Sequence, residues 1–266
     1  MKANQRIKTL CLVLYGLLIS TTETHSEAVM TKKVVKLLAT PGQTLTAKTT
    51  ITAKGVHKKE LKAFYGEQVQ PYLSQVGKMR SILYRDYPYL YAPDFDPELE
   101  DTSSYQNSNG TIMVASFTND QLVGFAIGLP LKDYAPKFDP KDKKIKAAQR
   151  FKGVQVELAT CFYINEICVI PEYRHKGFEK ELYKALENEV LKTNKYQTIS
   201  ILHMDRGDKH PLKPKVFVDP EKEIFKTHNF EKTDKQITFS WNTVQLNGSS
   251  KKQDNAMNFW VKRIKN

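Results

Sequence analysis

The sequence predicts an α/β (α+β) protein in which a mixed central β-sheet has helices on both faces. Three observations support this fold class. Short apolar runs typical of strands alternate with segments in which apolar residues recur at three- and four-residue spacing. A hydrophobic content of 40% with 11% aromatic residues argues against disorder. The predicted order is two helices, two strands, then strand, helix, strand, helix and two final strands, and this order indicates a sheet covered on both sides.

Ahead of this domain, residues 1–28 have the layout of a secretory signal peptide. Basic residues precede an apolar run from Leu10 to Ile19, and Ser26 and Ala28 are the small residues expected before a cleavage site. The apolar run is too short to cross a bilayer as a helix. We therefore expect an exported protein, periplasmic or secreted, without a stable membrane anchor, and a cytoplasmic protein if the signal is not functional.

The region after the signal is predicted to be extended and then helical. Residues 29–55 are rich in threonine and lysine and are expected to form an N-terminal lead-in to a domain of residues 56–266. Apolar residues at helical spacing predict a helix over residues 56–76. Pro71 lies inside this pattern and is expected to kink or split the helix. A second short helix is predicted over residues 78–84.

The middle of the chain predicts a β-hairpin followed by an insertion. Residues 111–117 and 122–129 are strand-like, and Thr118-Asn119-Asp120-Gln121 between them has the composition of a hairpin turn. The acidic, serine-rich residues 94–110 predict a loop or a short helix. The proline- and lysine-rich residues 130–152 are expected to form a surface insertion.

The last part of the chain predicts strands and helices in alternation. The apolar residues 158–170 are expected to form a buried strand, and a helix with one buried face follows at residues 178–194. Further predicted elements are strands at residues 198–204, 236–246 and 256–264, a proline-rich loop at 207–220, a short helix at 221–227 and a turn at 247–250. Trp241 and Trp260 of the final strands are expected in the core.

Charge and cysteine content exclude several classes of function. The net charge of +12 favours anionic ligands, but the basic residues are spread along the chain, so we expect no nucleic-acid binding. Cys161 and Cys168 on one strand would have Cα atoms about 23 Å apart, too far for a disulfide. The spacing of Cys and His matches no metal-ligand pattern, and we expect no metal site.

The junction between the predicted strand and the helix that follows it is the most informative feature. A β-branched run stops at Pro171, and a short basic loop with Arg174, His175, Lys176 and Gly177 leads directly into the helix. The first amides of a helix lack intrahelical partners, and the helix dipole favours an anion there. Glycine also lets the backbone approach phosphates closely. The loop therefore predicts a pyrophosphate site for a phosphorylated cofactor.

This junction resembles the signature of the GNAT superfamily of N-acetyltransferases, Arg/Gln-x-x-Gly-x-Gly/Ala after a strand that ends in Val-x-Pro-x-Tyr. The chain has the corresponding residues from Val169 to Glu179. Other segments resemble one bacterial GNAT subgroup of largely unassigned substrate. These segments are Tyr87–Tyr91, Phe162–Glu166, His210–Pro214, Phe239–Trp241 and Met257–Trp260. Together they extend over most of residues 56–264.

The resemblance implies a GNAT-type sheet whose cofactor strand is splayed from its neighbour, with acetyl-CoA as the acyl donor. Eight residues would bind this cosubstrate, through the pantetheine arm on the strand and the pyrophosphate in the loop. They are Ile167, Cys168, Val169, Arg174, His175, Lys176, Gly177 and Phe178. The acceptor amine, on a small molecule or a protein, would enter from the side built by the first two helices.

Glu166 is the candidate catalytic base, because several GNAT enzymes have a catalytic glutamate at this place on the cofactor strand. A charged residue in an apolar strand is unfavourable to bury unpaired, so the alternative role is an ion pair with an Arg or Lys. Glu157 is a weaker candidate for the base. Cys168 shares the strand face of Glu166 by two-residue alternation, and we expect a small apolar filler rather than a nucleophile.

Tyr87, Tyr89 and Tyr91 are candidates for the wall of the acceptor site, where their hydroxyls would orient a polar substrate. His210, in a proline-rich loop that resembles the subgroup motif, is expected to line the same site. The alternative is an aromatic lid over the helix–sheet junction, with His210 as a loop anchor.

The chain departs from the GNAT pattern at two positions. Glu179 stands where the motif usually has Gly or Ala, and its carboxylate would repel a pyrophosphate unless it faces away or pairs with a neighbouring lysine. A glutamate in the first turn also complements the helix dipole. Phe225 stands where many members have a tyrosine that protonates the leaving thiolate. Water, Tyr183 or His228 would then supply the proton, or the chain is no longer catalytic.

We therefore predict an acetyl-CoA-dependent N-acyltransferase that moves an acetyl group to a primary amine by direct attack on the thioester. The competing prediction, favoured by Glu179 and Phe225, is a GNAT-fold acyl-CoA-binding protein with weak or no turnover. A third hypothesis, a basic exported protein that binds surfaces, rests on charge alone. The acceptor and the oligomeric state do not follow from the sequence.

Overall fold

The computed structural model describes residues 43–45, 50–52, 55–57, 59–92, 102–135, 154, 156–215, 217 and 219–264. Its strands are β1 (Gln43–Leu45), β2 (Thr50–Thr52), β3 (Gly55–His57), β4 (Lys59–Tyr65), β5 (Ile112–Thr118), β6 (Gln121–Pro130), β7 (Cys161–Val169), β8 (Thr198–Met204), β9 (Glu231–Val244) and β10 (Ser250–Arg263). Its helices are η2 (Gly66–Tyr72), α3 (Leu73–Leu83), α4 (Ser103–Gln106), α5 (Leu131–Tyr134), η5 (Pro171–Tyr173), α7 (Phe178–Lys192) and η6 (Glu221–Lys226). The predicted signal peptide and most of the predicted insertion at 130–152 lie outside the described residues.

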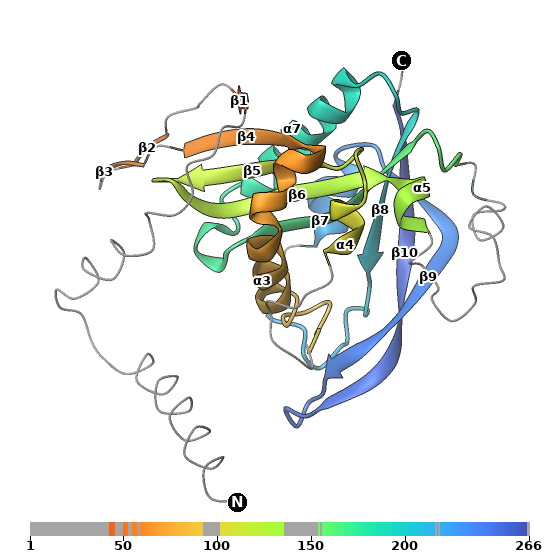
Figure 1. The fold of residues 1–266 in the computed structure, drawn as a ribbon. Helices are drawn as coiled ribbons and strands as arrows, with labels where there is room; N and C mark the ends of the chain where they lie inside the picture. Colours follow the sequence, from red (N-terminus) through yellow and green to blue (C-terminus); the bar gives the residue numbers. More distant parts are fainter. Residues whose placement is uncertain are drawn as a thin grey trace, which may run out of the picture. The chain divides into compact units, whose positions relative to one another are not determined.

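Within the described residues, eight strands form one sheet in the order β1-β4-β5-β6-β7-β8-β10-β9 (Figure 1). All neighbours in this sheet are antiparallel except β7 and β8, which run parallel. β2 and β3 form a separate pair. The described helices include none long and apolar enough to cross a membrane.

Each face of the sheet has its own buried cluster, because side chains alternate along a strand. Phe125 and Ala126 are consecutive on β6 and belong to opposite clusters. The first cluster contains Val76 of α3, and the second contains Leu182 and Leu186 of α7. The predicted fold class, a mixed sheet with helices on both faces, is confirmed.

Most predicted elements are confirmed, and β8 spans residues 198–204 as predicted. The β5–β6 hairpin turns at Asn119 and Asp120, whose φ angles of 50° and 63° suit a two-residue hairpin turn. The final hairpin is longer than predicted, since β9 and β10 each have 14 residues. The added residues are mostly polar and exposed, so no apolar pattern marks them as strand.

The prediction of a helix beginning at residue 56 is wrong as far as residue 65. This region forms β3 and β4, and Phe64 and Tyr65 face opposite clusters as in a strand. Pairing with β5, a contact between distant segments, fixes β4 as a strand. Helical structure begins at η2, and α3 then continues into the second predicted helix. Pro71 lies inside η2, two residues before α3 begins, so the helical region is split into two segments here.

The parallel strands β7 and β8 separate toward their C-terminal ends. Their pairing runs from Cys161 with Thr198 to Ile164 with Ile201, although both strands continue beyond it. In this second half, β7 pairs with β6 and β8 pairs with β10. The splayed strand that the resemblance implied is therefore present, and the edge of β7 toward β8 has no strand partner there among the described residues.

Candidate active site

A cavity of about 800 Å³, here called the loop cavity, lies around the loop between β7 and α7. Six of the eight predicted cofactor residues line it, namely Ile167, Cys168, Val169, Arg174, His175 and Gly177. The other two, Lys176 and Phe178, lie beside Tyr173. Lys176 Nζ is 5.6 Å from the centre of the Tyr173 ring, and the centre of the Phe178 ring is 5.2 Å from it. The structure thus brings most of the predicted cofactor residues to one cavity.

The loop holds its shape through Arg174 and through two left-handed residues. The guanidinium of Arg174 donates to the Val169 carbonyl at 3.1 Å and to Asp86 at 3.2 Å. His175 and Gly177 have φ angles of 60° and 83°, and α7 begins at the next residue. No described side chain caps this helix, and a Cβ built on Gly177 would meet nothing within 4 Å. The amides at the start of α7 are therefore accessible to an anion.

Glu179, the first departure from the GNAT pattern, is part of the lining of the loop cavity. Its neighbour Lys180 lies 3.9 Å from Glu223 and is paired there. A second acidic residue of the first turn, Glu181, forms an ion pair with Lys59. An anionic ligand in the loop cavity therefore has the Glu179 carboxylate as a neighbour.

A second cavity, of about 400 Å³ and here called the aromatic cavity, lies on the α3 side of the sheet. Among the described residues that line it, eight have aromatic rings. These are Tyr84, Tyr89, Tyr91, Tyr105, Tyr134, Tyr163, Phe239 and Trp241. They come from segments at both ends of the domain, so the cavity forms only when the domain is packed.

The two tryptophans of the last strands have different surroundings. Trp260 is buried in the cluster beneath α7, as predicted. Trp241 is half-buried, lines the aromatic cavity and donates from Nε1 to the Tyr89 carbonyl at 3.3 Å. The predicted core position is met only in part by Trp241, which packs against the first cluster while β9 brings its ring over the segment that follows α3.

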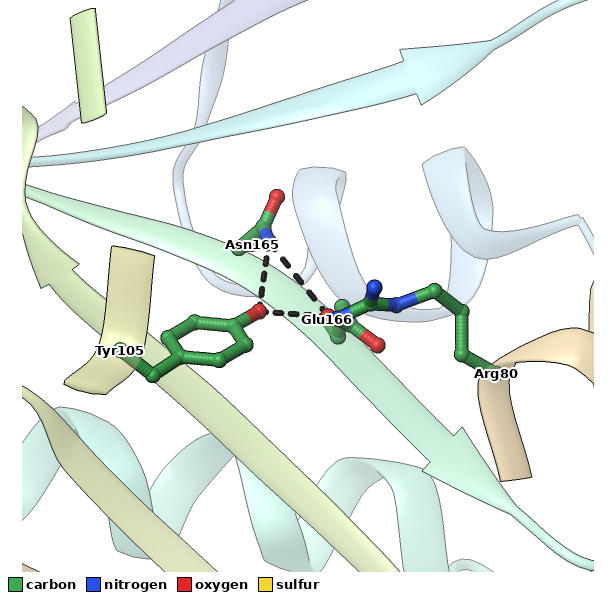
Figure 2. A network of polar contacts seen from close by, with 4 residues as sticks. All are labelled: Arg80, Tyr105, Asn165 and Glu166. Atoms are coloured by element: carbon green, nitrogen blue, oxygen red, sulfur yellow. Dashed lines mark hydrogen bonds and ion pairs between the residues drawn. The ribbon is translucent and has the colours of Figure 1, made fainter. Parts of the chain in front are cut away.

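Glu166, the predicted base, lines the aromatic cavity and is 2% exposed. Figure 2 shows its contacts with Arg80 of α3 and Tyr105 of α4. Arg80 Nη2 donates to Glu166 Oε1 at 2.5 Å, and the Tyr105 hydroxyl donates to the same oxygen. Asn165 Nδ2 lies 3.4 Å from this oxygen. The other oxygen, Oε2, is buried without a hydrogen-bond partner in the described part of the chain.

One oxygen of Glu166 therefore forms the ion pair considered as its alternative role, and the other is available as an acceptor, so its role as a base stays a prediction. Burial lowers the pKa of Arg80 and the Glu166 carboxylate raises it, with a net result well above the ordinary value, so Arg80 stays cationic. Burial and then the Glu166 charge raise the pKa of Tyr105, whose hydroxyl stays a donor. The sequence analysis named neither Arg80 nor Tyr105. It indicated only that a buried Glu166 would need an Arg or Lys as its ion-pair partner.

A β-bulge in β7 places Glu166 on the side of the aromatic cavity. Glu166 is paired with Ile127 and Ile164 with Gly128, so Asn165 is an extra residue without a partner on β6. Strict alternation from Tyr163 would direct residue 165 alone to this face, whereas the bulge brings residues 165 and 166 to the lining. A Cβ on Gly128 would lie 2.5 Å from the Tyr163 carbonyl oxygen, so this close approach requires glycine.

The two cavities meet at Tyr84 and Tyr89, which line both of them. Their rings are stacked with centroids 4.3 Å apart. The hydroxyl of Tyr84 is hydrogen-bonded to Cys168, a residue of the loop cavity. Burial, followed by the Cys168 and Glu166 charges, raises the pKa of Tyr84 well above its ordinary value, so its hydroxyl keeps its proton at neutral pH. Tyr84 is a functional candidate that the sequence did not single out.

The predicted acceptor residues divide between the two cavities. Tyr89 and Tyr91 line the aromatic cavity, whereas Tyr87 lines the loop cavity and has its ring 5.7 Å from that of His210. His210 is not among the described residues that line either cavity. Its Nδ1 accepts from the Leu212 amide at 3.2 Å, which fits the alternative role of a loop anchor.

The remaining candidates are absent from the lining of both cavities, as far as the structure describes them. Glu157 is exposed before β7. Phe225 is 2% exposed in the cluster beneath α7. Tyr183 and His228 have ring centroids 4.4 Å apart in this same region. The described residues include no group of three His, Cys, Asp or Glu placed to hold a metal ion.

Comparison with known proteins provides an independent finding. The family model described as the acetyltransferase (GNAT) family matches residues 76–210, which is 135 of the 266 residues. No curated protein matches the chain. The matched residues include α3 from residue 76 onward and the whole of β7, the loop and α7.

Similar solved structures include three acetyltransferases. One is ribosomal-protein-alanine N-acetyltransferase from Brucella melitensis, at 14% identity and a TM-score of 0.46 over 76% of this chain and 99% of that one. PaiA N-acetyltransferase from Thermoplasma acidophilum in complex with coenzyme A has 12% identity and a TM-score of 0.43, over 78% and 99% of the two chains. An aminoglycoside 6′-N-acetyltransferase complexed with coenzyme A has 16% identity and a TM-score of 0.42, over 76% and 96%.

Proposed function

The chain belongs to the acetyltransferase (GNAT) family, and on this premise we propose that it transfers an acetyl group from acetyl-CoA to an amine bound in the aromatic cavity. The observation that carries the proposal is that Tyr84 and Tyr89 line both cavities. A donor in the loop cavity and an acceptor in the aromatic cavity would therefore react where the cavities meet.

The loop cavity suits the donor in two respects. The uncapped start of α7 and the space above Gly177 suit a pyrophosphate, and Arg174 supplies a cation beside it. The splayed end of β7 leaves backbone groups available for the amides of a pantetheine arm. Glu179 opposes this attraction, so we expect weaker cofactor binding than the family motif would give.

The chemistry we propose uses one residue on each side of the junction. The bound ammonium first loses one proton to solvent. Glu166 Oε2 then accepts a proton from the neutral amine, whose nitrogen forms a bond to the thioester carbonyl carbon as the carbon–sulfur bond breaks. The Tyr84 hydroxyl donates its proton to the departing sulfur. The proton held by Glu166 then passes through solvent to restore Tyr84, so the products are an amide and a free thiol.

Calorimetry of the full chain with acetyl-CoA, followed by a thiol-release assay over a panel of amines, tests the proposal. We expect a dissociation constant below about 1 mM and thiol release that depends on the amine. Absence of binding at millimolar acetyl-CoA would overturn donor recognition altogether.

A second function, an acyl-CoA-binding protein without turnover, is favoured by one observation. Phe225 is buried and has no hydroxyl at the position of the usual proton donor. Binding of acetyl-CoA without thiol release for any amine would support this second function over the first.

A further inference from the structure

The lining of the aromatic cavity restricts which amine it can take. In the described lining the charged side chains are Arg80 and Glu166, which form one ion pair at 2.5 Å. The rest of the wall is mainly aromatic, with Met257 beside the rings. The cavity therefore combines a balanced charge with walls made mainly of aromatic rings, six of them from tyrosines whose hydroxyls add polar groups, although the whole chain has a net charge of +12.

Two buried polar atoms of this lining are without hydrogen-bond partners in the described structure, Glu166 Oε2 and Ser104 Oγ. Glu166 is 2% exposed and Ser104 is 9% exposed. A buried polar atom without a partner is unfavourable, and a carboxylate oxygen can only accept. The partner of Oε2 is therefore an N–H or O–H donor from outside the described part of the chain, and the ammonium group of a ligand would satisfy it.

The ring faces favour a cation as that donor, and the size of the cavity limits the body attached to it. An ammonium over an aromatic face gains about 0.5–2 kcal/mol. An apolar cavity of about 150 Å³ holds one benzene molecule. The aromatic cavity, at about 400 Å³, has room for a body of one or two fused rings.

We propose that the aromatic cavity binds a small monoamine on an aromatic body, an arylalkylamine, with its nitrogen at Glu166 Oε2. The role of this ligand as the acetyl acceptor rests on the proposed function. Its binding to the cavity does not depend on that function. A polyamine or an aminoglycoside needs several carboxylates, and the described lining offers one. A peptide lysine has the same ammonium group but no aromatic body to contact the rings of the lining.

Binding to the full chain without acetyl-CoA tests the ligand class independently of turnover. Calorimetry would compare 2-phenylethylamine and tryptamine with spermidine, with a lysine-containing tripeptide and with 2-phenylethanol, which has the ring but no ammonium. We expect both arylalkylamines to bind at least about tenfold more tightly than the other three probes, because cation–π contact and the Glu166 pair act together. Tighter binding of spermidine or the tripeptide would overturn the proposal.

Single substitutions locate the site. Trp241→Leu and Tyr134→Leu should each weaken tryptamine binding about fivefold to tenfold and leave acetyl-CoA affinity unchanged. Tyr87→Leu, in the loop cavity, is the control and should leave tryptamine binding unchanged. Unaltered tryptamine affinity in both cavity variants would place the ligand elsewhere and overturn the proposal.

The two proposals fail in different ways. Arylalkylamine binding without acetyl-CoA binding would leave the ligand class intact and overturn the acetyltransferase function. Acetylation of spermidine or the tripeptide, but of neither arylalkylamine, would leave the function intact and overturn the ligand class.

Discussion

The loop cavity and the aromatic cavity share two tyrosines and are otherwise built in different ways. The loop cavity takes eight of its 20 described lining residues from one continuous stretch, the end of β7, the loop and the first turn of α7, and the other twelve from residues 83–89 and 212–224. The aromatic cavity takes its rings from segments between Tyr84 and Trp241, which are distant in the sequence. The part of the loop cavity that we propose for the pyrophosphate therefore comes from a short motif, whereas the aromatic cavity depends on how the whole domain packs.

The two cavities also differ in the charged side chains that line them. The loop cavity contains both Arg174 and Glu179, which act on an anion in opposite directions. The aromatic cavity has one closed ion pair and one unsatisfied carboxylate oxygen. Substitutions in one cavity should therefore leave binding in the other unchanged, and each prediction below tests that separation.

The largest expected effect is at Glu166 in the aromatic cavity. Glu166→Gln removes the proton acceptor but keeps the side-chain shape, so kcat/KM for the amine should fall about 100- to 1,000-fold. Acetyl-CoA affinity, measured by calorimetry, should not change. Glu157→Gln, at an exposed acidic residue, is the matched control.

Two results would contradict this role of Glu166. Equal activity of Glu166→Gln and the native chain would exclude it as the base. A loss of acetyl-CoA affinity would instead show that the cavities are coupled. Thermal unfolding checks the fold, because the variant leaves Arg80 without its anion.

The next effect is expected where the two cavities meet. Tyr84→Phe keeps the stacked ring and removes the hydroxyl that we propose as the proton donor. We therefore expect kcat to fall about tenfold to 100-fold while acetyl-CoA affinity stays constant. Tyr89→Phe is the matched control, because it changes the other ring of the stack. If kcat in Tyr84→Phe equals that of the control, water rather than Tyr84 protonates the thiolate.

A smaller effect, of opposite sign, is expected in the loop cavity. Glu179→Ala removes one negative charge near the predicted pyrophosphate, so acetyl-CoA should bind about fivefold more tightly, equivalent to about 1 kcal/mol. The gain should shrink in 1 M salt, because salt screens the repulsion. Glu181→Ala is the control, since Glu181 is paired with Lys59 and is not part of the described lining. Unchanged affinity at low salt would mean that Glu179 points away from the ligand.

The smallest effect on activity is expected at Cys168. Burial and the Glu166 charge raise the pKa of its thiol, and burial raises that of Cys161 to about 11, so both thiols stay neutral at pH 7–9. Labelling by a thiol reagent should be slow in the folded chain and fast after unfolding, and Cys168→Ala should keep full activity. A raised folded-state pKa stabilises the fold below the unfolded pKa of about 8.5 and loses this contribution as the pH rises through the folded value. Fast labelling of the folded chain at pH 7 would contradict this.

The sequence predicted the strands and helices whose pattern is local. The strands β5 to β8 and the amphipathic α7 were predicted to within three residues, because apolar runs mark strands that are buried on both faces and period-3.6 burial marks the helix. The prediction of a helix over residues 56–65 was wrong. The apolar residues there recur at mixed three- and four-residue spacing, but pairing of β4 with β5 fixes the segment as a strand. Local preference gives way where a distant strand supplies the hydrogen bonds.

The candidate site was predicted in the same uneven way. Glu166 was singled out by its charge in an apolar strand, and the basic loop by its composition. Tyr84, Arg80 and Trp241 were missed or misplaced, because a tyrosine at a helix end, an arginine in a helix and a tryptophan in a strand have no local mark of function. Their roles come from partners on other elements.

By itself the sequence determined the alternation of elements, the basic loop before α7 and the presence of a carboxylate on the strand that precedes it. These depend on residues that are neighbours in the chain. Tertiary structure alone decided that β7 splays from β8, that the bulge at Asn165 directs Glu166 to the α3 side, and that the final hairpin closes an aromatic cavity around it. Those features arise from pairing and packing between segments that are distant in the sequence. A local sequence pattern does not show which distant segments will make these contacts.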